Sequence, residues 1–266
     1  MQERLQWIRL RPRSWVDWAP LAGGMQAHAA VAGAYPDAQC WMVEANERCQ
    51  HAVLHALRPP WWRRAQRRAV AAQSGVPPPS GVDMLWANMA LHAAADPHGL
   101  LEQWSRMLAP DGFLMFSCLG PDTLVELRSL YRAQGWPPPA HEFTDMHDWG
   151  DMLLRAGFAE PVMDMERITL TFAGEERLLA ELRGLGRNLH RERFAALRGR
   201  RWHAQLLAQL GARRTGSQPL ALTFEVIYGH ALKPQPRVPV QPEAVLSLAG
   251  MREALQRARR GPTAGS

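Results

Sequence analysis

The residues whose types and spacing suggest chemistry lie near the start of the chain. Asp17 stands in an apolar stretch, and a short segment after it ends in the glycine pair Gly23 and Gly24. A second carboxylate, Glu44, follows Gly23 by 21 residues. Glycines let backbone N–H groups approach a ligand closely, and a carboxylate at this interval accepts hydrogen bonds from both hydroxyls of a ribose. The pattern indicates a site for a nucleoside-containing cofactor.

The turn between Asp17 and the glycine pair departs from a glycine-rich loop, because Ala19, Pro20 and Leu21 occupy it. Proline has no N–H, and leucine adopts positive φ only at a cost. We expect a modified cofactor turn that keeps the glycine pair at a helix start. Glu44 has an alternative interpretation as a solvated helix cap. Asn88, after the apolar stretch 82–87, either lines the same crevice or forms a turn.

Four candidate substrate-binding residues lie further along: Thr123, His141, Asp145 and His147. Thr123 alternatively caps the helix that follows it. The polar cluster at 141–148 could suggest a metal site, but Asp145 and His147 are two residues apart and should not share a helix face. We therefore expect a polar helix start and no metal. No catalytic residue is identified.

Short apolar runs alternate with helical patterns over the first 120 residues. The expected strands are 14–19, 38–45, 82–91 and 113–119, and the expected helices are 25–36, 46–57 and 97–112. This alternation predicts an α/β fold with a parallel, doubly wound sheet and right-handed crossovers.

The pattern changes in the second half. A helix is expected at 144–157, with Thr144 as its N-cap and Gly157 ending it, and strands at 166–172 and 221–234. The arginine-rich helical stretch 173–219 separates these strands and is either a lid over the site or a solvated helical pair. We expect one domain over residues 1–233 and a proline-rich tail over 234–266.

Composition bounds the class of protein. Hydrophobic residues make up 47% of the 266, enough to bury a substantial core. The net charge of +6 reflects either a biased coding sequence, since Lys233 is the only lysine, or an acidic partner. The arginine- and tryptophan-rich stretch 59–70 is better explained as a packed helix than as a nucleic-acid site. Neither a signal peptide nor a membrane span is evident, and Cys40, Cys49 and Cys118 form no CxxC pair, so we expect a cytoplasmic protein without nucleic-acid or membrane partners.

Three longer segments carry a family resemblance: "LAPDGFLMFSCLGPDTLVELRSLY", "FTDMHDWGDMLLRAGFAEPVMDMERITLTF" and "LTFEVIYGHALKP". They resemble the BioC family of malonyl-acyl-carrier-protein O-methyltransferases of biotin synthesis. The resemblance implies a Rossmann-like, seven-stranded methyltransferase sheet with helices on both faces and a helical insertion before the last strand. It implies S-adenosylmethionine as cofactor and an acyl carrier protein carrying a malonyl thioester as partner, with the enzyme a monomer.

Position by position, the resemblance assigns the cofactor site to Asp17, Gly23, Gly24, Glu44 and Asn88. Glu44 matches the ribose-binding acid, and Gly23 matches the last glycine of a turn whose other two glycines are replaced here. The acid that usually contacts the adenine has no counterpart between positions 48 and 82. The family's N-terminal helical segment has no counterpart either, so we expect the gene to encode an extension upstream. We expect cofactor binding weaker than in a glycine-rich relative.

The implied chemistry is an in-line methyl transfer to a carboxylate that is already ionised at neutral pH, so no general base is required. Orientation alone can supply about 7–11 kcal/mol. Two alternatives remain open: a methyltransferase with another acceptor, and a cofactor-poor relative that acts as a binding or assembly factor.

Overall fold

The computed structural model describes residues 1–57, 70–71, 80–214 and 219–236. The helix expected at 59–70 and most of the expected tail, from 237 onward, lie outside these residues. Contacts divide the chain into two units, Met1–Pro234 and Gln235–Ser266, and the first carries every element described below. No helix among the described residues is long and apolar enough to cross a membrane.

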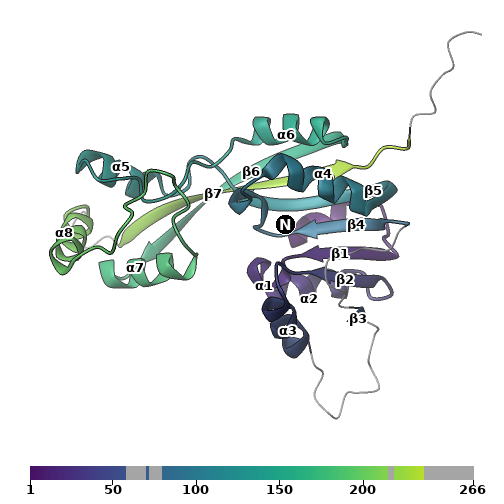
Figure 1. Ribbon diagram of the computed structural model, residues 1–266, viewed down its shortest axis with the longest axis horizontal. Coiled ribbons are helices and arrows are strands. Elements are labelled where there is room, and N and C mark those ends of the chain that lie inside the picture. The colour runs from purple at the N-terminus through teal and green to yellow at the C-terminus, as the bar shows by residue number, and fades with distance from the viewer. Residues whose placement is uncertain (58–69, 72–79, 215–218, 237–266) are drawn as a thin grey trace, which may run out of the picture. The chain divides into compact units, whose positions relative to one another are not determined.

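The strands of the first unit form one sheet in the order β3-β2-β1-β4-β5-β7-β6 (Figure 1). They are β1 (Ser14–Trp18), β2 (Gln39–Val43), β3 (Val70–Ala71), β4 (Val82–Ala87), β5 (Leu108–Leu119), β6 (Ala159–Phe172) and β7 (Leu220–Leu232). Strands β1 to β5 pair in parallel, whereas β7 is antiparallel to both β5 and β6. The order reverses between β1 and β4, and ligands of open α/β sheets bind at the carboxyl edge of such a reversal.

The helices follow the expected alternation in the first half and then gather in the second. They are η1 (Gln2–Trp7), α1 (Pro20–Gly23), α2 (Met25–Ala34), α3 (Glu47–Ala56), η3 (Leu91–Ala93), α4 (Pro97–Met107), α5 (Val125–Ala133), α6 (Met146–Arg155), α7 (Glu175–Gly184) and α8 (Arg200–Gly211).

Alternate residues of the central strands enter two separate cores, because successive side chains of a strand point to opposite faces. Val16 and Leu85 pack with Leu101 and Trp104 of α4 and with Leu153 of α6. On the other face, the neighbouring strand residues pack against α2 and α3; the core members there include Trp15, Met84, Val31 and Val53. The Rossmann-like sheet with helices on both faces is thus confirmed.

The expected helix 97–112 is too long. Helix α4 ends at Met107, and β5 begins at the next residue with an irregular start in which Asp111 has φ 64°. Pro110 and a positive φ are both incompatible with a continuing helix. The backbone of this bulge is tied to the end of β7, since Lys233 donates to the Gly112 carbonyl at 2.7 Å.

The expected strand 166–172 is the second half of a longer strand. β6 starts at Ala159 and has a register shift against β7 between Ala159 and Val162, where Glu160 has φ 50°. Helix α6 also differs at its start: Asp145 and not Thr144 is the N-cap, because the Asp145 carboxylate accepts the His147 N–H at 2.8 Å. A carboxylate at this position also interacts favourably with the helix dipole. Gly157 ends the helix with φ 86°, as expected.

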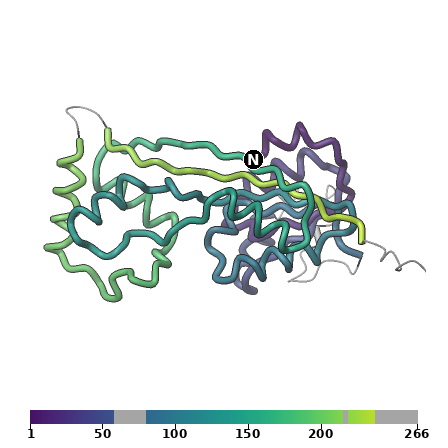
Figure 2. The backbone as a smooth tube through the Cα atoms, turned by 90° about the horizontal axis from the view of Figure 1, so that it is seen from above, coloured from purple at the N-terminus to yellow at the C-terminus, as the bar shows by residue number. Residues whose placement is uncertain are grey.

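Strands β6 and β7 run side by side beyond the other strands and reach α5, α7 and α8 (Figures 1 and 2). The helices α7 and α8 lie within the expected insertion 173–219. A third core joins them to the distal ends of the two strands, and its members include Leu127, Leu178, Leu210, Leu222 and Phe224. The described part of the insertion is therefore a packed helical pair; its role as a lid stays a prediction.

Candidate functional site

The turn after β1 is a short helix and not a glycine nest. The Ala19 N–H donates to the Val43 carbonyl at 2.8 Å, and α1 follows directly from Ala19, whose φ of 52° lies in the left-handed region. Gly24, with φ 95°, joins α1 to α2, and a side-chain carbon placed there would meet no atom within 4 Å. The glycine pair therefore leaves open space at the end of β1.

Glu44 closes this turn from the end of β2. Its Oε1 accepts a hydrogen bond of 2.8 Å from the Leu21 N–H, one of the donors that the start of α1 leaves unpaired. Glu44 does not cap α3, since Asn46 does so by accepting the Cys49 N–H at 2.9 Å. The half-buried carboxylate thus faces the turn after β1, and no other hydrogen bond to it is present among the described residues.

Asn88 connects the ends of three strands. Its Nδ2 donates to the Gly23 carbonyl, and its Oδ1 accepts a hydrogen bond of 2.6 Å from the Ser117 hydroxyl of β5. Ser117 in turn accepts the Met89 N–H at 3.1 Å. The structure brings Gly23, Glu44 and Asn88 together at the carboxyl edge; it adds Ser117, which the sequence signalled only as one hydroxyl in an apolar strand.

Asp17 lies apart from this edge, buried beneath α2 with 2% of its surface exposed. Its Oδ2 is 2.8 Å from Nδ1 of His28, whose ring stacks on Trp15. Burial raises the pKa of Asp17, and the hydrogen bond with His28 opposes that shift. The carboxylate contacts the helix that follows the glycine pair, so it can act on a cofactor only by positioning the turn. Sequence reasoning missed His28.

Beyond the ends of β4 and β5 lies a cavity of about 300 Å³, bounded on its far side by the segment after α7. Thr123 and His141 line it together with the polar residues His92, Arg187 and Asn188. Most of its remaining wall is apolar. Asp145 and His147 do not line it. Two of the four substrate-binding candidates therefore share one cavity, which begins four residues after Asn88.

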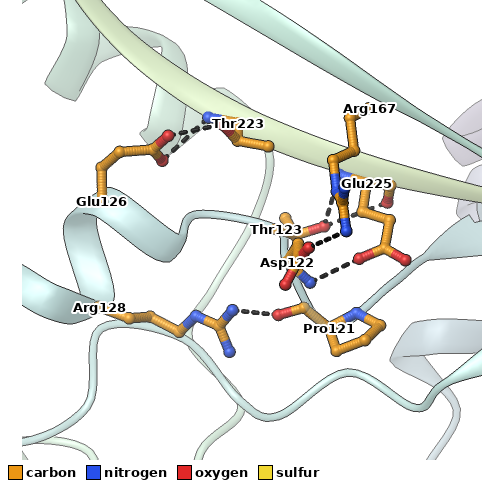
Figure 3. Close-up of polar contacts among 8 residues, drawn as sticks. All are labelled: Pro121, Asp122, Thr123, Glu126, Arg128, Arg167, Thr223 and Glu225. Atoms are coloured by element: carbon orange, nitrogen blue, oxygen red, sulfur yellow. Dashed lines mark hydrogen bonds and ion pairs between the residues drawn. The ribbon is translucent and has the colours of Figure 1, made fainter.

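Thr123 is fully buried, and its hydroxyl does not cap α5. The hydroxyl donates to the Glu225 carbonyl and accepts the Glu225 N–H, both at 3.2 Å (Figure 3). Glu225 also accepts the Asp122 N–H at 2.7 Å through its carboxylate, and Arg167 forms an ion pair with Asp122. The interpretation of Thr123 as an N-cap was wrong, because β7 runs close enough to bind its hydroxyl.

His141 and His92 form the polar corner of the cavity. Nε2 of His141 binds the His92 carbonyl at 2.9 Å, and the His141 ring lies 4.5 Å from that of Phe143. Burial, assisted by His141, lowers the pKa of His92 to about 4. Nδ1 of His92 is buried and has no hydrogen-bond partner among the described residues. His92 is therefore neutral at neutral pH, and the corner carries no fixed charge.

Asp145 and His147 interact, contrary to the expectation from helical spacing. Oδ1 of Asp145 lies 2.6 Å from Nδ1 of His147, and hydrogen bonds from His147 lower the pKa of Asp145. The separation fails because Asp145 is the N-cap and lies outside the helix, so its side chain turns back over the first turn. Both side chains are exposed, and the described residues contain no group of three that could hold a metal ion.

A larger cavity, of about 570 Å³, lies on another part of the fold. It is formed by the segment around η1 and by β5, β6 and β7, and Arg4, Trp7 and Tyr228 contribute to its wall. None of the candidate site residues lines it. Volume alone therefore does not identify the site at the carboxyl edge.

Three comparisons bear on this site. A family described as a methyltransferase domain matches residues 3–160. A malonyl-[acyl-carrier protein] O-methyltransferase of Gallionella capsiferriformans is 38% identical over 90% of this chain and 83% of its own length. A protein of the same description from Methylovorus is 36% identical over 90% of this chain and 81% of its own length.

Among solved structures, a candidate methyltransferase of Bacillus halodurans superposes with a TM-score of 0.59. It is 14% identical, and the match covers 88% of this chain and 98% of that one. At this identity the likeness concerns the fold alone.

Proposed function

Because this chain belongs to the family of the malonyl-[acyl-carrier protein] O-methyltransferases, we propose that it methylates the free carboxyl of a malonyl thioester on acyl carrier protein, in biotin synthesis. The observation that carries the proposal is the meeting of Gly23, Glu44 and Asn88 at the switch in strand order, directly beside an apolar cavity. A donor held at the edge and an acceptor held in the cavity would be neighbours.

The carboxyl edge fits S-adenosylmethionine as the methyl donor. The space beside Gly24 is open, and the Glu44 carboxylate lies at the place where ribose hydroxyls bind in such folds. We assign the ribose to Glu44 and the methionine part to Gly23 and Gly24, with Asn88 holding the Gly23 carbonyl. When bound, the cofactor supplies an electrophilic methyl group on a sulfonium.

The cavity fits a small acid on an apolar carrier arm. Arg187 is the arginine in its wall and supplies a positive charge for the malonyl carboxylate, while the neutral His92 and His141 leave the charge of the cavity unchanged. The acceptor needs no deprotonation, because a carboxyl is ionised at neutral pH. The chain therefore acts by orienting the carboxylate and excluding water, and methylation removes the charge that Arg187 binds.

The test is incubation of the purified protein with S-adenosylmethionine and malonyl-acyl carrier protein, followed by intact mass spectrometry of the carrier. We expect one methyl group on the malonyl form and none on an acetyl form, which has no free carboxyl. Calorimetry with S-adenosylhomocysteine measures the cofactor site separately. Failure to bind it at millimolar concentration, together with no methylation, would exclude the proposal and favour a cofactor-poor binding factor.

A further inference from the structure

The positive charge of the chain is concentrated in one segment. Residues 183–214 contain nine arginines and one carboxylate, Glu192, so their surplus of positive charge exceeds the net +6 of the whole chain. The segment runs from the end of α7 to just beyond α8, and all of it is described by the structure. A biased coding sequence would spread arginines evenly, so it does not account for this clustering.

Several of these arginines are not used within the fold. The segment's arginines that are exposed and make no side-chain hydrogen bond or ion pair with any described residue are Arg183, Arg187, Arg191, Arg200 and Arg201. Arg198, in contrast, packs over Phe194 and Trp202 at 3.9 and 4.4 Å. The unpaired guanidinium groups keep their hydrogen-bonding capacity for carboxylates of another molecule.

Large apolar side chains are exposed among these arginines. Leu185 is 67% exposed, Leu189 51% and Leu197 99%, and Phe194 is also exposed. A basic face that only keeps the chain in solution has no use for such side chains, whereas apolar residues ringed by charge are typical of protein-binding surfaces. The segment therefore presents both the charge that attracts an acidic partner and the apolar area that retains it.

This surface is continuous with the cavity. Leu185, Arg187 and Leu189 belong to the exposed segment and also line the cavity that holds Thr123 and His141. A macromolecule that delivers a small acid into the cavity must pass this wall.

We propose that residues 183–201 are the docking surface for the carrier protein, bound as an acidic protein through Arg183, Arg191, Arg200 and Arg201 and through Leu185 and Leu197. The inference rests on the proposed function for the identity of the partner. Opposite charge accelerates encounter and fixes orientation, and the apolar contacts add affinity. The cavity mouth then lies within the docked area, so the carried malonyl group is already at its entrance.

The experiment uses the triple variant Arg191→Glu, Arg200→Glu and Arg201→Glu, because none of these residues lines the cavity. A matched control carries the same charge change at Arg11, Arg13 and Arg155, which are exposed and lie outside the segment. Calorimetry measures the affinity of each protein for the carrier without its malonyl group. Steady-state kinetics compare malonyl-acyl carrier protein with malonyl-N-acetylcysteamine, which has no carrier.

We expect the triple variant to bind the carrier at least tenfold more weakly and its KM for the carried substrate to rise similarly. Its kcat/KM for the carrier-free thioester should match the wild type, and the control should match the wild type in every measurement. Equal losses in variant and control, or carrier binding unchanged in the variant, would overturn the docking surface. Wild-type protein that binds the carrier but methylates neither substrate would contradict the proposed function and leave the surface supported.

Discussion

The Leu21 N–H donates a hydrogen bond of 2.8 Å to Oε1 of Glu44, so the acid at the end of β2 holds the turn that follows β1. The two residues are 23 positions apart and belong to neighbouring parallel strands. Glu44 therefore has two roles in the proposed enzyme: it supports the turn and it offers a carboxylate to a ribose.

Substitutions at Glu44 separate these roles. Glu44→Ala removes both and should weaken binding of S-adenosylhomocysteine by about 1–3 kcal/mol, because ribose hydroxyls lose their acceptor. Glu44→Gln keeps an oxygen for the Leu21 N–H, so it should retain the wild-type unfolding free energy while still losing affinity. Calorimetry and urea denaturation measure the two quantities. Wild-type affinity in Glu44→Ala would remove the residue from the site.

The turn itself predicts opposite outcomes for two glycine substitutions. Ala19 has φ 52°, so Ala19→Gly relieves strain that offsets the entropy of a glycine, and the unfolding free energy should change by less than about 0.5 kcal/mol. Leu21 lies in α1 with helical geometry, so Leu21→Gly should lower it by about 1 kcal/mol. Urea denaturation of both variants checks the pair, and equal losses would contradict the left-handed conformation of Ala19.

Gly23 should not tolerate a side chain. A Cβ there would lie 2.8 Å from the Asn88 carbonyl oxygen, and that backbone cannot move without disturbing the bond to Ser117. We expect Gly23→Val to abolish cofactor binding while the protein stays folded. Gly33→Ala is the control, because a Cβ at Gly33 in α2 meets no atom within 4 Å and should be neutral or stabilising. Binding by Gly23→Val equal to wild type would make the turn purely structural.

His92 should make the protein sensitive to mild acid. Its pKa is lowered from 6.5 to about 4 in the folded state, so between these values the unfolded chain binds a proton that the folded chain does not. Stability is therefore full above pH 6.5 and declines as pH falls toward 4, by on the order of 2 kcal/mol. His92→Asn should flatten this decline, although His230, whose pKa is also lowered by burial, keeps part of it. Denaturation at pH 7 and pH 5 gives the comparison; an unchanged slope in the variant would refute it.

Thr123 is expected to stabilise the loop at the cavity and not to bind substrate directly. Thr123→Val removes the two hydrogen bonds to Glu225 from a fully buried position and should lower the unfolding free energy by about 1–3 kcal/mol. Thr123→Ser keeps the hydroxyl and should lose less. A rise in KM for the malonyl thioester in Thr123→Val without loss of stability would instead place the hydroxyl on the substrate.

Local sequence patterns predicted the elements of the fold well, since alternation and helix caps are properties of neighbouring residues. The positions of Gly23, Glu44 and Asn88 followed from the rule that carboxyl ends of parallel strands share an edge. Contacts between distant segments were not predictable. Nothing near Thr123 announces that Glu225 lies beside it, and nothing near Asp17 announces His28, because both pairs are made by packing.

Errors arose where one residue set the local geometry. The positive φ of Asp111 ended α4 early, and the choice of Asp145 over Thr144 as N-cap brought His147 within reach of its carboxylate. In both places the helical pattern continues in the sequence, and only the backbone conformation decides where it stops.

The pairing of β6 with β7 has a consequence for how this protein can change over evolution. The register continues without a shift from Val162↔His230 to Phe172↔Leu220, so the helical segment between the strands leaves and re-enters the sheet at adjacent positions. Exchange of that segment would leave the rest of the sheet in register, provided that the replacement covers the apolar ends of both strands. The wall of the cavity is thus a module, and a new partner or acceptor can be acquired by replacing it while the edge that holds Glu44 stays as it is.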